Sequence, residues 1–135
     1  MQLTGRVLDV YDVDTIIVLV PAVVKSTETE SEGGEKLSTI RVRLLDTRVA
    51  NCDVYARDAL IRLIAASNGY FCTLMDLSTR ATRRDVFANN PCLMKLDCRG
   101  FDKNGRVLVH ASGVGEHGGG DFVSELARGG WINRG

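Results

Sequence analysis

Long apolar runs are missing from this 135-residue sequence. No stretch approaches the roughly 20 apolar residues that cross a bilayer. The opening MQLTGRVLDVYDVD also lacks the basic segment and apolar core of a signal peptide. These absences predict a soluble, cytoplasmic protein. Because 44% of the residues are hydrophobic and the length suits one core, we expect a single domain over residues 1–135.

Metal-binding patterns of cysteine and histidine are missing as well. The four cysteines form no CxxC pair and the two histidines form no HxxxH or HxH pair, so a zinc site is not expected. The glycine-rich stretch GVGEHGGGD matches neither the dinucleotide-binding nor the P-loop pattern. Reduced thiols and a flexible connection are the simpler interpretations.

Net charge is absent too, since 17 basic residues balance 17 acidic ones. Net charge alone therefore cannot hold a polyanion. The acids are unevenly placed, however, because STETESEGGE at 26–35 contains four glutamates and no base. This segment carries −4, which leaves +4 for the rest of the chain, so a locally basic face is compatible with the sequence.

Local patterns predict strands in the first third of the chain and again near residue 100. Apolar and β-branched residues over 4–20, broken at DVDT, predict two strands or one sharply bent strand. STIRVRLLDT alternates as a half-buried strand that ends at Asp46. Residues 92–113 predict two strands joined by a turn at DKNG.

Two helices and two irregular segments complete this prediction. DVYARDALIRLIAAS predicts a helix over 53–67 with Asn51 or Asp53 as N-cap, and a last helix begins at Asp121 and stops at Gly129 or Gly130. The expected order is β-β-β-α-β-β-α. An exposed acidic loop is expected over 25–36, and an excursion that ends in a loop over 70–91. Within the 70–91 excursion, we interpret Arg80, Arg83 and Arg84 as part of a solvated loop. The alternative is that they contact a nucleic acid backbone.

The acidic turn DVDT is the first candidate for chemistry. Asp12 and Asp14 are two residues apart, so their side chains project from the same face of extended backbone. Like charges at that spacing repel one another unless a cation or water lies between them. A lone pair of this kind is usually a solvated turn, so its meaning depends on the motifs that follow.

Taken in order, DVDT, RVRLLDT, YARDALIRLIAA, DKNGR and the last helix resemble the staphylococcal nuclease (thermonuclease) family over nearly the whole chain. That family carries a DGDT-like turn, then Arg-x-x-x-x-Asp-Thr-Pro-Glu, then Asp-x-x-Gly-Arg. The resemblance implies an α+β, mainly β fold, an OB-fold five-stranded barrel with two or three helices. It also implies a Ca²⁺-dependent nuclease, in this family an endonuclease, with DNA or RNA as partner and single strands favoured.

The resemblance assigns roles residue by residue. Arg41 and Arg106 match the catalytic arginines, whose planar guanidinium groups can each hold two phosphate oxygens. Carboxylates and carbonyls are the oxygen ligands that Ca²⁺ prefers. The implied calcium ligands are Asp12, Asp14, Asp46 and the carbonyl of Thr47.

One departure from the family bears directly on catalysis. Val49 stands where the family has the glutamate that activates water, and Arg48 replaces the preceding proline. Losing a general base typically costs about 10²- to 10⁴-fold in rate. Asp53 or a metal-bound hydroxide remains as a substitute for that base. The sequence therefore favours a hydrolase with altered or impaired water activation, with a non-catalytic nucleic-acid-binding module and a protein-interaction domain as alternatives.

Overall fold

Five strands close into a barrel in the computed structural model, which describes residues 2–12, 15–21, 37–45, 47–48, 54–71, 76–114 and 120–134. Around the barrel the order is β1-β2-β3-β6-β5, and β5 closes back on β1. β3 and β6 pair in parallel, and the other neighbours are antiparallel. This arrangement confirms the predicted OB-like, mainly β fold class. The strands are β1 (Gln2–Asp12), β2 (Thr15–Pro21), β3 (Leu37–Leu44), β5 (Leu93–Phe101) and β6 (Val107–Ser112).

Apolar side chains that alternate along these strands fill the barrel. Val7 and Val10 of β1, Ile16 and Val18 of β2, and Val42 of β3 are all completely buried. The strand expected to end at Asp46 does have Val42 and Leu44 inside, as its alternation predicts. The DVDT break separates two strands rather than bending one, because β1 and β2 pair as a hairpin.

One glycine allows β1 and β2 to approach closely. Gly5 is buried, and a Cβ at this position would overlap Cγ1 of Val18 and lie 3.0 Å from Cγ1 of Val20. Further along β1, Val7 pairs with Val18 but Asp9 pairs with Ile17, so Leu8 is an extra residue in a β-bulge. The bulge shifts which β1 side chains face outward beyond Leu8.

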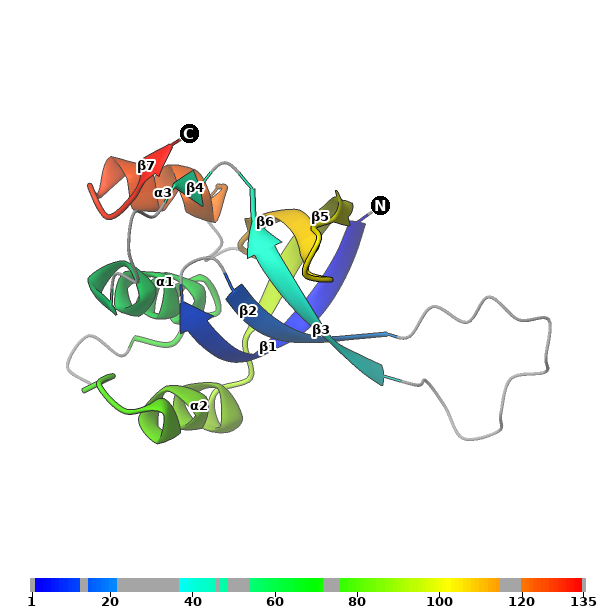
Figure 1. Ribbon diagram of the computed structural model, residues 1–135. Coiled ribbons are helices and arrows are strands. Elements are labelled where there is room, and N and C mark those ends of the chain that lie inside the picture. The colour runs from blue at the N-terminus through cyan, green and yellow to red at the C-terminus, as the bar shows by residue number, and fades with distance from the viewer. Residues whose placement is uncertain are drawn as a thin grey trace, which may run out of the picture.

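Two of the three helices that the structure describes follow the prediction. α1 (Val54–Ser67) buries a face that includes Ala56, Leu60 and Ile64, as their helical spacing indicates. α3 (Phe122–Arg128) begins at Asp121, whose Oδ2 accepts a hydrogen bond from the Ser124 N–H at 3.3 Å, and it ends at Gly129. The helices lie to one side of the barrel, and α2 lies beneath the others (Figure 1).

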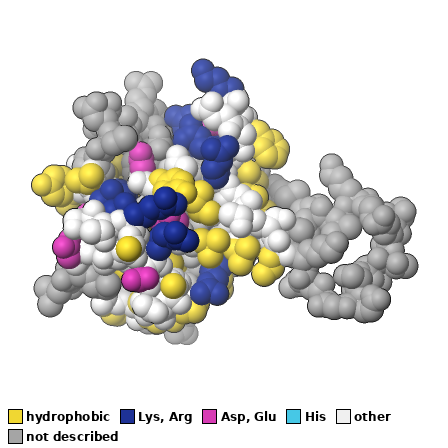
Figure 2. Space-filling view, turned by 60° about the horizontal axis from the view of Figure 1, so that its bottom comes forward, with side chains coloured by type: hydrophobic (Ala, Val, Ile, Leu, Met, Phe, Trp, Pro, Cys, Tyr) yellow, Lys and Arg dark blue, Asp and Glu magenta, His cyan; other side chains and the backbone are white. Residues whose placement is uncertain are grey.

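The third helix corrects the sequence-based expectation. The sequence predicts a loop for the last part of the 70–91 excursion, and instead α2 (Arg80–Asn89) packs against β1. Thr79 caps it, because its hydroxyl accepts a hydrogen bond from the Thr82 N–H at 3.2 Å. Val86 and Phe87 are buried beneath it. The face that carries α2 is turned forward in Figure 2, where Lys and Arg side chains gather near its centre.

Two further strands also amend the expected order. β4 (Thr47–Arg48) and β7 (Asn133–Arg134) form a small antiparallel sheet, so the described order is β-β-β-β-α-α-β-β-α-β. The expected acidic loop and the N-cap at Asn51 or Asp53 lie outside the described residues. Among the helices that the structure describes, none has the length and apolar character needed to cross a membrane.

Candidate functional site

Of the two predicted catalytic arginines, Arg41 lies on β3 and Arg106 directly precedes β6, at the same level of the barrel. Val42 of β3 pairs with Val107 of β6 in the parallel ladder. Arg41 precedes the first of these residues and Arg106 precedes the second. Since neighbouring strands are only about 5 Å apart, the register brings the two positions together at one end of the barrel.

The turn between β5 and β6 is built on a single carboxylate. Oδ1 of Asp102 accepts hydrogen bonds from the backbone N–H groups of Asn104 and Arg106, both at 2.9 Å. Gly105 has a φ of 81°, a left-handed conformation that favours glycine. The DKNG sequence thus folds as a tight turn, as predicted, and Arg106 leaves it with a fixed backbone direction.

The Arg106 side chain is clamped by two groups. Its Nε donates to Oδ2 of Asp102 at 2.8 Å, and its Nη1 donates to Oγ1 of Thr15 at 2.9 Å. Only 15% of the side chain is exposed. These bonds fix the plane of the guanidinium group between the β5–β6 turn and the β1–β2 hairpin.

The same contacts set the acidity of Asp102. Partial burial acts to raise the pKa of its carboxyl, but hydrogen bonds from the Arg106 backbone, the Arg106 guanidinium and the Asn104 N–H outweigh it and lower the pKa below its ordinary value. Asp102 is therefore ionised at neutral pH. Its negative charge compensates the positive charge of the half-buried Arg106.

Arg41 is held by the same turn from the other side. Its Nη2 donates to the backbone carbonyl of Asn104 at 2.8 Å, while the residue itself is exposed. Its strand neighbour across the ladder is Ile17 of β2. One guanidinium group is therefore half-buried and oriented, and the other lies at the surface of the same barrel end.

The β1–β2 hairpin brings one predicted calcium ligand to this end. Asp12 pairs with Thr15, whose hydroxyl receives the hydrogen bond from Arg106. The Leu45 N–H donates to the Val109 carbonyl at 2.8 Å, so the chain continues beside β6 up to the residue before Asp46. Thr47 lies in β4, paired with Arg134.

The remaining predicted site residues, Asp14, Asp46 and Val49, lie outside the described residues. Across the part of the chain that the structure does describe, no three His, Cys, Asp or Glu side chains gather to hold a metal ion. The structure therefore gives the position of both arginines and of Asp12, and leaves the calcium site a prediction.

Three residues of the site lie within the motifs but were given no role by them. Asp102, Asn104 and Thr15 make the hydrogen bonds that orient the arginines. An Asp followed by Asn and Gly is a signal for a turn in which the Asp side chain caps backbone N–H groups, and it points to Asp102. The Asn104 carbonyl and the Thr15 hydroxyl carry no such signal.

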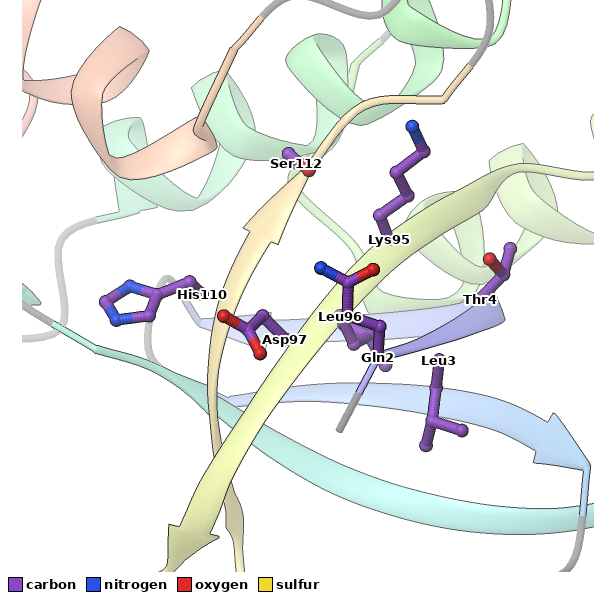
Figure 3. Close-up of a pocket in the computed structure, with 8 residues that line it drawn as sticks. All are labelled: Gln2, Leu3, Thr4, Lys95, Leu96, Asp97, His110 and Ser112. Carbon is purple, nitrogen blue, oxygen red and sulfur yellow. The ribbon is translucent and has the colours of Figure 1, made fainter.

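A hollow of about 320 Å³ lies on β1, β5 and β6, away from the β5–β6 turn. Asp97 and His110 are cross-strand neighbours there, and Lys95 pairs with Ser112 one step further along. Figure 3 shows the Asp97 carboxylate close to the His110 ring. No residue assigned to the nuclease motifs lines this hollow.

Comparison of the chain with protein-family models, with curated proteins and with solved structures found no match. The resemblance to the nuclease family therefore stands on the ordered motifs alone.

Proposed function

We propose that this protein is a Ca²⁺-dependent nuclease that hydrolyses phosphodiester bonds of single-stranded DNA or RNA. The observation that carries the proposal is that Arg41 and Arg106, which directly precede the paired residues Val42 and Val107, are both held by the turn at 102–106. Two fixed cations beside a surface at which an acidic residue, Asp12, also arrives suit a substrate with a phosphate group.

The arginines supply what phosphodiester hydrolysis demands. Negative charge accumulates on the phosphate oxygens in the transition state, so preorganised cations lower the barrier. Arg106 is oriented before substrate arrives, since Asp102 and Thr15 fix its plane. Arg41 lies at the surface, where it would bind and position the incoming phosphate.

The donor set suits calcium. Asp12, Asp14, Asp46 and the carbonyl of Thr47 are hard oxygen donors, and Ca²⁺ takes such ligands in flexible shells. When bound, the ion would supply positive charge at the phosphate and at the attacking water. Asp12 lies close to the clamped arginine, because it pairs with Thr15, whose hydroxyl accepts a hydrogen bond from Arg106.

The valine at position 49 favours a second function. Its side chain cannot accept a proton, so water activation must come from another group or be lost. If it is lost, the same arginines serve a non-catalytic OB-type module that binds nucleic acid. Both functions need phosphate binding, and only turnover separates them.

A cleavage assay tests the proposal. Purified wild type, Asp46→Ala and Val49→Glu are incubated with labelled single-stranded DNA and RNA, with Ca²⁺ or with a chelator. Asp76→Ala, which changes an exposed aspartate elsewhere in the chain, is the matched control. We expect Ca²⁺-dependent cutting by wild type and the control, and loss of at least about 10²-fold in Asp46→Ala.

The Val49→Glu variant decides between the two functions. If wild type is inert and this variant cuts, the scaffold is a nuclease disabled at one position and the binding module is correct. If neither protein cuts nor binds a nucleoside bisphosphate in Ca²⁺, both functions are wrong.

A further inference from the structure

A groove on the α2 face lies along β1, the strand that ends at Asp12, and has no part in the nuclease motifs. It has a volume of about 550 Å³ and lies between β1 and α2. Figure 2 looks toward this face, where basic side chains gather near the centre. The groove is lined by Arg6, Leu8, Ala81, Arg84, Asp85, Phe87 and Ala88.

The β-bulge in β1 determines which side chains reach the groove. Because Leu8 is the extra residue, the alternation of β1 shifts by one position beyond it. Arg6 and Leu8 line the groove before the shift, and Asp9 and Tyr11 contact α2 after it. The outer face of β1 therefore presents one continuous row of side chains to α2.

α2 runs alongside this row in the opposite direction. Nε of Arg80, at the start of the helix, donates to Asp9 at 3.2 Å, and its Nη2 donates to the Tyr11 hydroxyl at 2.6 Å. Arg84, one helical turn later, faces the groove beside Arg6. Since Tyr11 directly precedes Asp12, the row leads away from the candidate site along α2.

The groove contains cations whose hydrogen-bonding capacity is not used within the described chain. Nε of Arg6 is buried and has no hydrogen-bond partner there. Arg84 is exposed and makes no ion pair with any described residue. Asp85 also lines the groove, so two arginines and one aspartate give its lining a net charge of +1. Asp9, further along β1, is paired with Arg80.

We infer that this groove binds the phosphate backbone of a single-stranded nucleic acid that continues from the candidate site. The inference rests on the proposed function and names the surface that holds the strand beyond the cleaved bond. Arg6 and Arg84 contact phosphates, while the apolar floor of Leu8, Ala81 and Ala88 lies against sugars or bases. At about 3.3 Å per strand residue, the row from Arg6 to Tyr11 spans about 16 Å, enough for a short run of nucleotides.

Length-dependent binding tests this inference. Affinities of a dinucleotide and an octanucleotide, both with cleavage-resistant phosphorothioate linkages, are measured in Ca²⁺ by fluorescence anisotropy over a series of salt concentrations. The variants are Arg84→Gln and Arg6→Gln combined with Arg84→Gln. Arg128→Gln is the matched control, because Arg128 is exposed on α3 and pairs with Glu125.

Wild type should bind the octanucleotide more tightly than the dinucleotide. Loss of two phosphate contacts should lower the salt slope by about 1.4 and the octanucleotide affinity by on the order of 25-fold at about 0.1 M salt. The dinucleotide affinity and the control should not change. Because Arg6 is half-buried, Arg84→Gln alone gives an independent check, with about half the change in slope.

The two hypotheses fail in different ways. Wild type could bind both oligonucleotides with equal affinity, or the double variant could keep the higher affinity for the octanucleotide. Either result would show that the groove does not bind the strand, and the proposed function would survive. If wild type binds neither oligonucleotide, the proposed function fails and the groove fails with it.

Discussion

Asp102 fixes the positions of both arginines of the candidate site. Its two carboxylate oxygens bind backbone N–H groups of the turn and the Nε of Arg106, and the turn so formed presents the Asn104 carbonyl to Arg41. A carboxylate that accepts several such bonds is stabilised in its charged form. The geometry of the site therefore depends on the ionisation of this residue.

Asp102→Asn should lower stability in a pH-dependent way. The pKa of Asp102 is lowered in the folded protein, so its contribution is fully present above the ordinary value of 3.8 and disappears as pH falls through the folded-state pKa. The variant should unfold at lower urea concentration than wild type at about pH 7, and the two midpoints should converge as pH falls through the folded-state pKa.

The control for this variant is Asp85→Asn, an exposed change on α2 whose midpoint should stay close to wild type at both pH values. A midpoint difference for Asp102→Asn that does not shrink in acid would show that its charge is not the cause.

At the residue scale, the sequence motifs single out side chains and give no account of the groups that hold them. The spacing of Arg41 and Arg106 within ordered motifs predicted two residues that the register does bring to the same level. Their partners were missed because one is a backbone carbonyl, that of Asn104, and the other is the hydroxyl of Thr15 from a distant hairpin. Contacts of that kind depend on tertiary structure.

At the scale of elements, α2 is attached to the barrel by a polar contact. Asp9 is buried, with 5% of its side chain exposed, and its described ion pair is with Arg80, which is 54% exposed. The Arg80 guanidinium also lies 4.6 Å from the centre of the Tyr11 ring. Oδ1 of Asp9 has no hydrogen-bond partner within the described chain, so the pair is the main compensation for this buried charge.

Arg80→Ala should therefore destabilise the protein by roughly 1–3 kcal/mol, less than a fully buried pair because Arg80 is half-exposed. Asp9→Asn should lower the free energy of unfolding less in the Arg80→Ala background, because it then removes a buried carboxylate that has lost its ion-pair partner. A double-mutant cycle by urea unfolding measures this coupling. Additive effects of the two changes would show that the pair does not hold α2 in place.

The sequence does not predict α2, and the reason is physical. A helix is recognised by a stripe of apolar residues, and RATRRDVFAN offers only Val86 and Phe87 as large apolar members. Its third buried residue is Arg83, whose Nη1 donates to the Leu77 carbonyl at 2.9 Å. The usable signal was the cap, with Thr79 just before the first helical residue.

The whole molecule depends on the barrel being closed, and Gly5 lies at a close contact in its wall. A Cβ at position 5 would overlap the Val18 side chain across the β1–β2 pair. The fold class was predictable because its strands alternate clearly. The β4–β7 sheet was not, because two-residue strands depend on where other elements bring them.

Gly5→Ala should lower the free energy of unfolding by about 1–3 kcal/mol, since an overpacked wall forces side chains and backbone to shift. Urea unfolding measures the change. Gly120→Ala is the matched control, because no described atom lies within 4 Å of a Cβ there and its effect should stay within about 0.5 kcal/mol. An equal, small change in both variants would refute the close approach.

The parallel contact between β3 and β6 has a consequence for how the protein folds. In the sequence, α1, α2 and β5 all lie between β3 and β6. Their pairing is therefore a long-range contact with a high entropic cost of loop closure. Arg41 and Arg106 are on opposite sides of this seam. Before β3 and β6 have paired, Arg41 and Arg106 are apart and only one of them can bind a given phosphate. Substrate would therefore bind weakly during folding. Once β3 and β6 have paired, bound substrate would oppose their separation, because substrate stabilises only the paired form.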